Sequence, residues 1–313
     1  MGDVYRAWDE HLSRDVAIKS LPRVFADDTE RLARLEREAK LLASLDHPKI
    51  ATIHGLEESD GMRFLVLELV VGETLAARLK KKPFPLKEAL EIGRQIAKGL
   101  EAAHEKGVVQ RDLKPGNVIL TEGNKVNILD FGLAKIQPMK SSAANGAESI
   151  SESMTKPGMI LGTAAFMSPE QAKGRPADIR NDIWAFGCIL YQCLTGRMPF
   201  YGETVSDALA AVLKNDPDWT ALPQDTPQNV RHVLRRCLEK DSALRFHDIA
   251  DVRIEIGEPA AVFAEKAGPS KQISPSLALG LVVVTATDAV LVTFFLMKYL
   301  RPTPFTPLVR TVI

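Results

Sequence analysis

Five polar side chains in the first half of the chain have types and spacings that suit phosphate and metal chemistry. Lys19 ends a short apolar run, Asp112, Lys114 and Asn117 fall within six residues, and Asp130 directly follows a second apolar run. Ammonium groups neutralise phosphate charge, a carboxylate orients a hydroxyl group, and carboxylate and amide oxygens suit a hard cation such as Mg²⁺. Each residue alone also has an ordinary explanation, since a lysine that ends a strand can extend its charged end into water.

These side chains belong to short motifs that follow one another in a fixed order. The order is Val16-Ala17-Ile18-Lys19, Glu38, residues 110–117 (QRDLKPGN), Asp130-Phe131-Gly132, Gly162-Thr163 and Ser168-Pro169-Glu170. Any one of these short motifs arises by chance, but the whole series at these separations does not. The series therefore predicts one site assembled from distant parts of the chain.

The ordered motifs resemble those of the eukaryotic-like (Hanks-type) Ser/Thr protein kinases, and most of all the bacterial membrane-anchored type. The segment 160–171 (ILGTAAFMSPEQ) is typical of that type, and the resemblance covers residues 1–256. It implies an ATP-dependent transfer of the γ-phosphate to Ser or Thr hydroxyls of proteins, with Mg²⁺ or Mn²⁺ as the metal. Lys114 is typical of Ser/Thr rather than tyrosine kinases.

The resemblance assigns a role to each motif residue. Asp112 would orient the substrate hydroxyl and accept its proton, Lys114 would neutralise the γ-phosphate, and Glu38 would pair with Lys19. The implied catalytic set is Asp112, Lys114, Lys19 and Glu38. The implied contacts to ATP and metal are Gly2, Val4, Ala17, Lys19, Leu67, Glu68, Val70, Asn117 and Asp130, and the metal ligands among them are Asn117 and Asp130.

Other positions are assigned to substrate, support or regulation by the same resemblance. Thr163 would line the substrate pocket and contact Asp112. Glu170 would form a buried ion pair with Arg245, and Asp182 would hold the backbone of the catalytic loop. Arg111 before Asp112 is the pattern of kinases that are switched by phosphorylation. The candidate phosphosites in the long segment 133–161 are Thr155 and Ser153, with Ser149 and Ser151 beside them; the alternative is a loop whose serines only solvate it.

Two departures from the family pattern affect these expectations. Gly2 and Val4 match only the last part of the Gly-rich loop, and the first strand before it is absent. We therefore expect Val4–Trp8 to form a sheet edge, with weaker ATP binding. A start placed too late explains this best, and a protein without the loop is the alternative. Gln110 stands where the family usually has His; it keeps hydrogen-bonding capacity, and we expect reduced activity at most.

Composition and patterning favour an α+β protein without a strong charge field. Lys and Arg total 40 and Asp and Glu total 40, so nothing favours nucleic acid as a partner. Cys188, Cys193 and Cys237 are read as buried thiols. The expected strands are 4–8, 16–21, 64–71, 118–120 and 126–129, the last two as a hairpin. The expected helices are 28–45, 86–106, 178–195, 205–214, 227–238 and 248–256. Early strands and late helices favour an α+β fold with two lobes. The resemblance implies that this is the two-lobed protein kinase-like fold.

The sequence predicts five regions. These are a kinase N-lobe without its first strand (1–70), a C-lobe (71–258), a linker (259–276), a transmembrane helix (277–297) and a short tail (298–313). Residues 277–297 carry one formal charge, Asp288, and are long enough as a helix to cross ~30 Å of hydrocarbon. The alternative is a buried C-terminal helix. Because ATP is intracellular, we expect a single-pass protein of the cell membrane with a cytoplasmic kinase domain.

Three other functions remain open from the sequence. A pseudokinase that acts as a binding module is supported only by the incomplete Gly-rich loop. A small-molecule phosphotransferase of related fold would lack the Gly-Thr and Ser-Pro-Glu segment. A membrane scaffold without activity would be indifferent to replacement of Asp130. A homodimer that phosphorylates itself is expected from the family alone, and the substrates and activating signal cannot be read.

Overall fold

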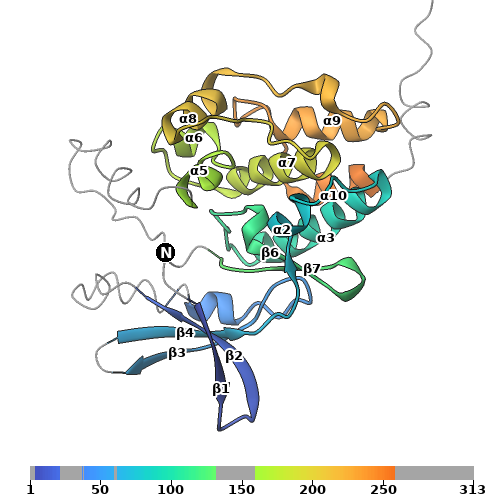
Figure 1. The fold of residues 1–313 in the computed structure, drawn as a ribbon. Coiled ribbons are helices and arrows are strands. Elements are labelled where there is room, and N and C mark those ends of the chain that lie inside the picture. Colours follow the sequence, from blue (N-terminus) through green and yellow to red (C-terminus); the bar gives the residue numbers. More distant parts are fainter. Residues whose placement is uncertain (1–3, 22–36, 38, 60–61, 132–158, 258–313) are drawn as a thin grey trace, which may run out of the picture. The chain divides into compact units, whose positions relative to one another are not determined.

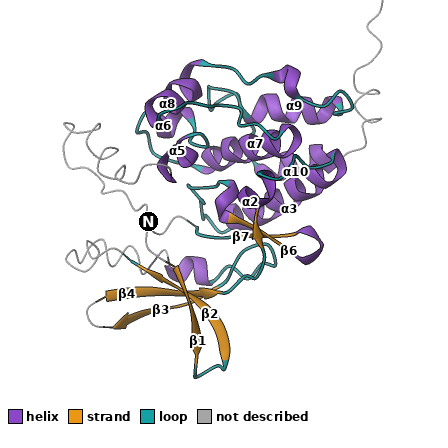
Figure 2. Ribbon diagram, viewed as in Figure 1, coloured by secondary structure: helices purple, strands orange, loops and turns teal. Residues whose placement is uncertain are grey.

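We describe the chain from a computed structural model, which describes residues 4–21, 37, 39–59, 62–131 and 159–257. Contacts between Cα atoms divide the chain into Met1–Ala260 and Ala261–Ile313, and every described residue belongs to the first unit. Figure 2 shows that this unit contains both strands and helices, and along the chain strands come before most of the helices. The α+β content predicted from the sequence is therefore present.

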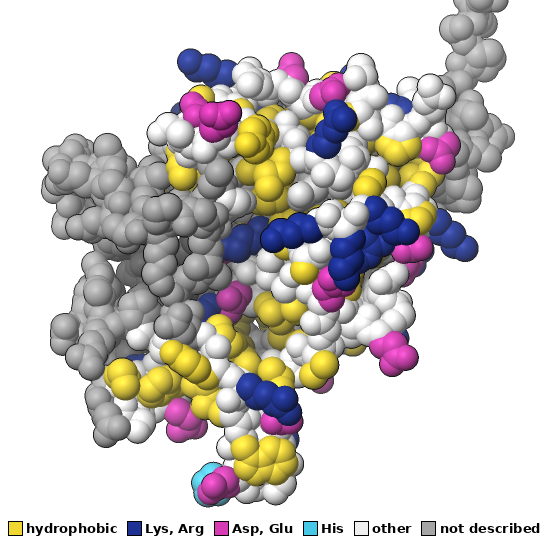
Figure 3. All heavy atoms as spheres, in the orientation of Figure 1, with side chains coloured by type: hydrophobic (Ala, Val, Ile, Leu, Met, Phe, Trp, Pro, Cys, Tyr) yellow, Lys and Arg dark blue, Asp and Glu magenta, His cyan; other side chains and the backbone are white. Residues whose placement is uncertain are grey.

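The first sheet contains four antiparallel strands in the order β1-β2-β4-β3. Their bounds are β1 Val4–Asp9, β2 Arg14–Ser20, β3 Ile53–Ser59 and β4 Met62–Glu68. Among the described strands β1 pairs only with β2, so it forms an edge. Hydrophobic side chains reach the surface over this strand pair in the space-filling view (Figure 3), in agreement with the exposure of Tyr5, Trp8 and Leu12.

The second sheet is a small hairpin with one added strand. It contains β5 Glu73–Thr74, β6 Val118–Thr121 and β7 Lys125–Ile128, in the order β5-β6-β7. Gly123 in the turn has φ +73°, a conformation that glycine adopts without strain. This is the hairpin that the sequence predicts. It directly follows residues 110–117, which we call the catalytic loop. Ala51 donates to the Ile128 carbonyl at 3.0 Å, which ties β7 to the chain that enters β3.

Helices form most of the remainder of the described chain (Figure 1). They are α2 Leu75–Leu79, α3 Leu86–Glu105, α5 Met159–Ala164, α6 Pro169–Ala172, α7 Ile179–Thr195, α8 Val205–Lys214, α9 Gln228–Cys237 and α10 Ile249–Gly257. The four helices from α7 to α10 agree with the predicted ranges to within one or two residues. The sequence reading did not assign β3, α2, α5 or α6, which are short or lack a clear period.

Helix α7 is the centre of the helical core. Asp178 caps its first turn, and Gly196, with φ +72°, ends it. Trp184, Phe186 and Tyr191 are almost completely buried, and α7 packs against α3 and α9. An apolar helix that is buried on nearly all sides needs neighbours on nearly all sides. Helix α7 is therefore a rigid support for the side chains of its first turn, which include Asp182.

The three cysteines are buried free thiols, as the sequence predicts. Burial raises the pKa of Cys188, Cys193 and Cys237 well above the ordinary thiol value. Within the described residues, no helix combines the length and the apolar character that crossing a membrane requires. The predicted span 277–297 lies outside those residues, as do the linker and the tail.

Candidate active site

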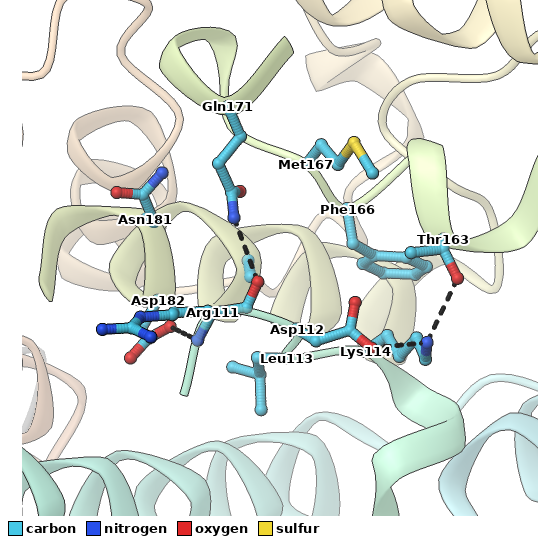
Figure 4. A pocket seen from close by; sticks show the side chains of 11 residues that line it. Arg111, Asp112, Leu113, Lys114, Thr163, Phe166, Met167, Gln171, Asn181 and Asp182 are labelled. Atoms are coloured by element: carbon cyan, nitrogen blue, oxygen red, sulfur yellow. Dashed lines mark hydrogen bonds and ion pairs between the residues drawn. The ribbon is translucent and has the colours of Figure 1, made fainter. Parts of the chain in front are cut away.

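The catalytic-loop motif is held between α3 and β6 and brings two charged side chains together. Lys114 Nζ lies 2.7 Å from Asp112 Oδ2 and donates to Thr163 Oγ1 at 3.1 Å (Figure 4). Thr163 belongs to α5, about fifty residues further along the chain. Three residues that the sequence assigned to one site therefore meet there, and Lys114 makes the contact to both of the others.

Asn117 adds an amide to the same loop. It ends the single 3₁₀ turn Pro115–Asn117 and is 4% exposed. Its Nδ2 donates to the Asp112 carbonyl at 2.9 Å, which turns the carboxamide oxygen away from that carbonyl. That oxygen is the atom that a hard cation requires.

Lys19 and Asp130 form the second charged pair of the site. Lys19 Nζ lies 2.7 Å from Asp130 Oδ1, and the side chains are 8% and 20% exposed. Lys19 comes from β2, and Asp130 follows β7 with φ +55°. A left-handed aspartate is uncommon and marks a turn that the surroundings hold in place. Glu38, the predicted partner of Lys19, lies outside the described residues.

Gln110 joins the two loops through a buried carboxamide. Its Oε1 accepts from the Asp112 N–H at 2.7 Å, and its Nε2 donates to the carbonyls of Leu129 and Asp130 at 3.3 and 3.1 Å. The side chain is completely buried. One amide thus supplies both an acceptor and a donor, which is why Gln can stand at this position.

Asp182 in the first turn of α7 holds the backbone of the catalytic loop. Its carboxylate accepts from the N–H groups of Gln110 and Arg111 at 2.8 and 2.9 Å, and from His104 Nε2 at 2.9 Å. Arg111 has φ +63°. Such a strained residue costs about 1–3 kcal/mol and persists only where the structure around it is strongly constrained.

Glu170 in α6 and Arg245, which precedes α10, form an ion pair. Arg245 is fully buried and donates through both terminal nitrogens to the two oxygens of Glu170, at 2.5 and 2.7 Å. It also donates to the Glu239 carbonyl at 2.7 Å. A bidentate pair whose other donors are also satisfied is the favourable form of a buried ion pair.

The register of the first sheet puts three of the predicted ATP contacts on one face with Lys19. Val4 lies opposite Lys19, and Ala17 lies opposite Leu67. Because side chains alternate along a strand, these four share the face that carries the Lys19 amine. The Glu68 side chain accepts from the Thr52 N–H at 3.0 Å.

Some predicted residues lie outside the described part of the chain or have no contact that tests them. Gly2, Glu38, Ser149, Ser151, Ser153 and Thr155 lie outside the described residues. Val70 follows β4 by two residues, and its backbone role stays a prediction.

Gln171 lines the pocket around Asp112, and the sequence analysis assigned no role to it. Gln171 in α6 donates from Nε2 to the Arg111 carbonyl at 3.0 Å (Figure 4). Its sequence signal, a glutamine three residues after Ser168, is the pattern of a helix capping box. That pattern predicts the cap but not the contact with a loop sixty residues away.

The donor set fits a metal held jointly with phosphate. Within the described residues, no group of three or more His, Cys, Asp or Glu side chains is placed to bind a metal ion. Asn117 and Asp130 offer hard oxygen atoms instead, and Mg²⁺ is commonly bound through one or two such side chains with phosphate and water. The chain's own residues therefore suit a nucleotide-bound cation.

Comparison with known proteins agrees with this geometry. The model of the family described as "Protein kinase domain" matches residues 1–252. The chain belongs to the protein kinase domain family.

Individual relatives are bacterial. The chain is 37% identical over 252 residues to the serine/threonine-protein kinase PknA of Mycobacterium tuberculosis, covering 79% of this chain and 55% of the relative. It is 36% identical over 258 residues to PrkC of Bacillus subtilis, covering 82% and 38%. The crystal structure of the M. tuberculosis PknI kinase domain matches with a TM-score of 0.61 and 25% identity, over 82% of this chain and 90% of that one. The chain spans about half the length, or less, of these curated relatives.

Proposed function

We propose that this chain is an ATP-dependent Ser/Thr protein kinase. The observation that carries the proposal is the meeting of Asp112, Lys114 and Thr163 beside the metal-type oxygens of Asn117 and Asp130. Similarity to the serine/threonine-protein kinases PknA and PrkC over about four fifths of the chain supports it.

The reaction assigns work to each side chain. The substrate hydroxyl oxygen bonds to the γ-phosphorus, the bond from that phosphorus to the bridging oxygen breaks, and ADP leaves. Asp112 orients the hydroxyl and accepts its proton, and Lys114 neutralises charge on the transferred group. Lys19 contacts the α- and β-phosphates. Mg²⁺ bound through Asn117 and Asp130 would supply further charge neutralisation.

The direct test is phosphate transfer. The purified chain is incubated with labelled ATP and MgCl₂ beside Asp112→Asn, with and without an upstream Gly-rich strand. Label on the wild-type chain alone supports the proposal. Label that requires the added strand assigns the activity to a longer protein. A folded chain without label in either form favours the pseudokinase, which binds partners without transferring phosphate.

We further propose that residues 277–297 span the cell membrane once, with residues 1–276 in the cytoplasm. The apolar character of 277–297 and the need for intracellular ATP support this. We also propose that two copies of the chain form a homodimer that phosphorylates Thr155 or Ser153. Membrane fractionation of the full chain against a chain ending at residue 276 tests the anchor. Mass spectrometry after incubation with ATP tests the phosphosites, and absence of phosphate from 149–155 would contradict them.

A further inference from the structure

The peptide group between Arg111 and Asp112 is gripped at both of its polar ends by side-chain amides. Gln171 Nε2 donates to its carbonyl oxygen at 3.0 Å, and Gln110 Oε1 accepts from its N–H at 2.7 Å. The same N–H also approaches the Gln110 carbonyl at 2.9 Å. The two amides come from different segments, since Gln110 lies in the catalytic loop and Gln171 lies in α6.

The Gln171 carboxamide uses both of its ends. Its Oε1 accepts from the Ser168 N–H at 3.0 Å, while Ser168 Oγ accepts from the Gln171 N–H at 3.2 Å. This reciprocal capping box fixes the first turn of α6. Because one end of the amide is held by the cap, the other end points at the Arg111 carbonyl in a fixed direction.

The cap itself is connected to α7. Ser168 Oγ accepts a second hydrogen bond from Asn181 Nδ2 at 2.6 Å, and Asn181 Oδ1 accepts from the Asp178 N–H at 2.7 Å. Ser168 and Asn181 are 0% and 1% exposed. Buried networks with every member satisfied are rigid, and losing one member leaves the others unpaired. These hydrogen bonds therefore fix the position of the α6 cap relative to α7.

The target of this network is a strained residue next to the reacting group. Arg111 has φ +63°, its N–H is held by Asp182, and its carbonyl is held by Gln171. Asp112 is the next residue, so any rotation of that peptide group moves its carboxylate. Helix α6 follows α5, which carries Thr163.

We propose that Gln171 is a positioning residue, which couples the docked α5–α6 segment to the orientation of the Asp112 carboxylate. When α6 is in place, its amide fixes the Arg111–Asp112 peptide group. When α6 moves away, that carbonyl loses its hydrogen bond from Gln171, and Asp112 loses its fixed orientation. This inference rests on the proposed function, because it concerns the same reaction.

The test compares two substitutions of Gln171 with a cap elsewhere. Gln171→Met removes both polar ends of the amide, and Gln171→Glu keeps the acceptor for Ser168 but removes the donor to Arg111. Thr204→Val is the matched control, since Thr204 forms a capping box with Asp207 at the start of α8. Helix α8 packs against α5 and α6, so this variant removes a cap beside the same segment without touching the Gln171 amide. Peptide phosphorylation gives kcat and the KM for ATP, and backbone amide exchange without nucleotide follows the Asp112 N–H.

We expect both Gln171 variants to lose about 10- to 100-fold in kcat, as a misplaced reacting group does. The KM for ATP stays within about twofold, because the substitutions change the orientation of Asp112 and not the residues that contact ATP. The Asp112 amide exchanges faster, and Thr204→Val changes none of these. An unchanged kcat, or a change in KM alone, overturns the proposal. If the chain transfers no phosphate with or without the upstream Gly-rich strand, the proposed function fails. Exchange then decides the coupling, and an unchanged Asp112 amide in Gln171→Met overturns it.

Discussion

The charged groups of the active site have different partners from those of the residues that support it. We call Glu170, Arg245 and Asp182 the support. In the site, Lys19 pairs with Asp130 and Lys114 pairs with Asp112, and each side chain keeps 8–20% of its surface exposed. In the support, Arg245 is 0% exposed and has Glu170 and several carbonyls as partners.

The difference concerns what each pair is able to exchange. A lysine that contacts one carboxylate can exchange that contact for phosphate without leaving a buried charge. Arg245 cannot, because removing Glu170 would leave a charge in the interior, with an effective penalty of several kcal/mol. The lysines of the site can therefore exchange a carboxylate for phosphate, whereas the Glu170–Arg245 pair must stay intact.

The largest expected effect that separates the two regions is a loss of rate without a loss of stability. Asp112→Asn removes the proton acceptor but keeps the shape, so kcat is expected to fall about 10²- to 10⁴-fold. The melting temperature should stay close to wild type, because the Asp112–Lys114 pair is partly solvated. Initial rates and thermal melts on the same preparation check this. A large fall in melting temperature would mean that the site is part of the support.

The support should show the opposite behaviour. Arg245→Met leaves the Glu170 carboxylate without its partner, and breaking a buried pair in this way costs about 3–5 kcal/mol of unfolding free energy. Chemical denaturation measures it, and Arg245→Met with Glu170→Leu should recover part of the loss. Arg6→Met is the matched control, because Arg6 makes a bidentate pair with Asp15 on the surface. An equal loss in the control would remove the distinction between buried and exposed pairs.

How much of this was readable from sequence differs between the two regions as well. The motif order predicted which residues meet at the site, and the period of α7 to α10 predicted the helices. The double contact of Gln110 and the reach of Gln171 were not readable, because both depend on backbone carbonyls at positions that only the folded loops define. Side-chain types predict chemistry, whereas contacts to backbone follow from tertiary structure.

Asp182 sharpens the comparison because it belongs to the support and touches the catalytic loop. Asp182→Asn replaces an acceptor oxygen with a donor and leaves an N–H of Gln110 or Arg111 unpaired, which costs about 1–3 kcal/mol. We expect kcat to fall as well, since Asp112 follows those residues. Asp178→Asn is the control, because Asn caps a helix as well as Asp does. Loss of stability with unchanged kcat would show that the support does not position the site.

The smallest expected effect concerns Lys240, whose ammonium lies 3.9 Å from the Phe200 ring centre and 5.1 Å from that of Trp184. Burial lowers the pKa of Lys240 to about 8, against 10.5 for a free lysine; Asp216 and Cys188 oppose the shift and Arg245 adds to it. Between these two pH values the unfolded chain binds the proton and the folded chain does not. The contribution of Lys240 to stability therefore rises with pH across this window.

The variant Lys240→Met isolates this contribution from that of the buried cysteines. Their raised pKa values act in the opposite direction above pH 9, because the folded chain keeps thiol protons that the unfolded chain loses. Both chains carry the same cysteines, so the difference in melting temperature between them reports Lys240. We expect the wild type to gain about 1–3 °C on Lys240→Met between pH 7 and pH 9, allowing for the partial exposure of the Lys240 side chain. A difference that is constant with pH would contradict the prediction, because it would mean that burial does not favour the neutral form of Lys240 in the folded chain.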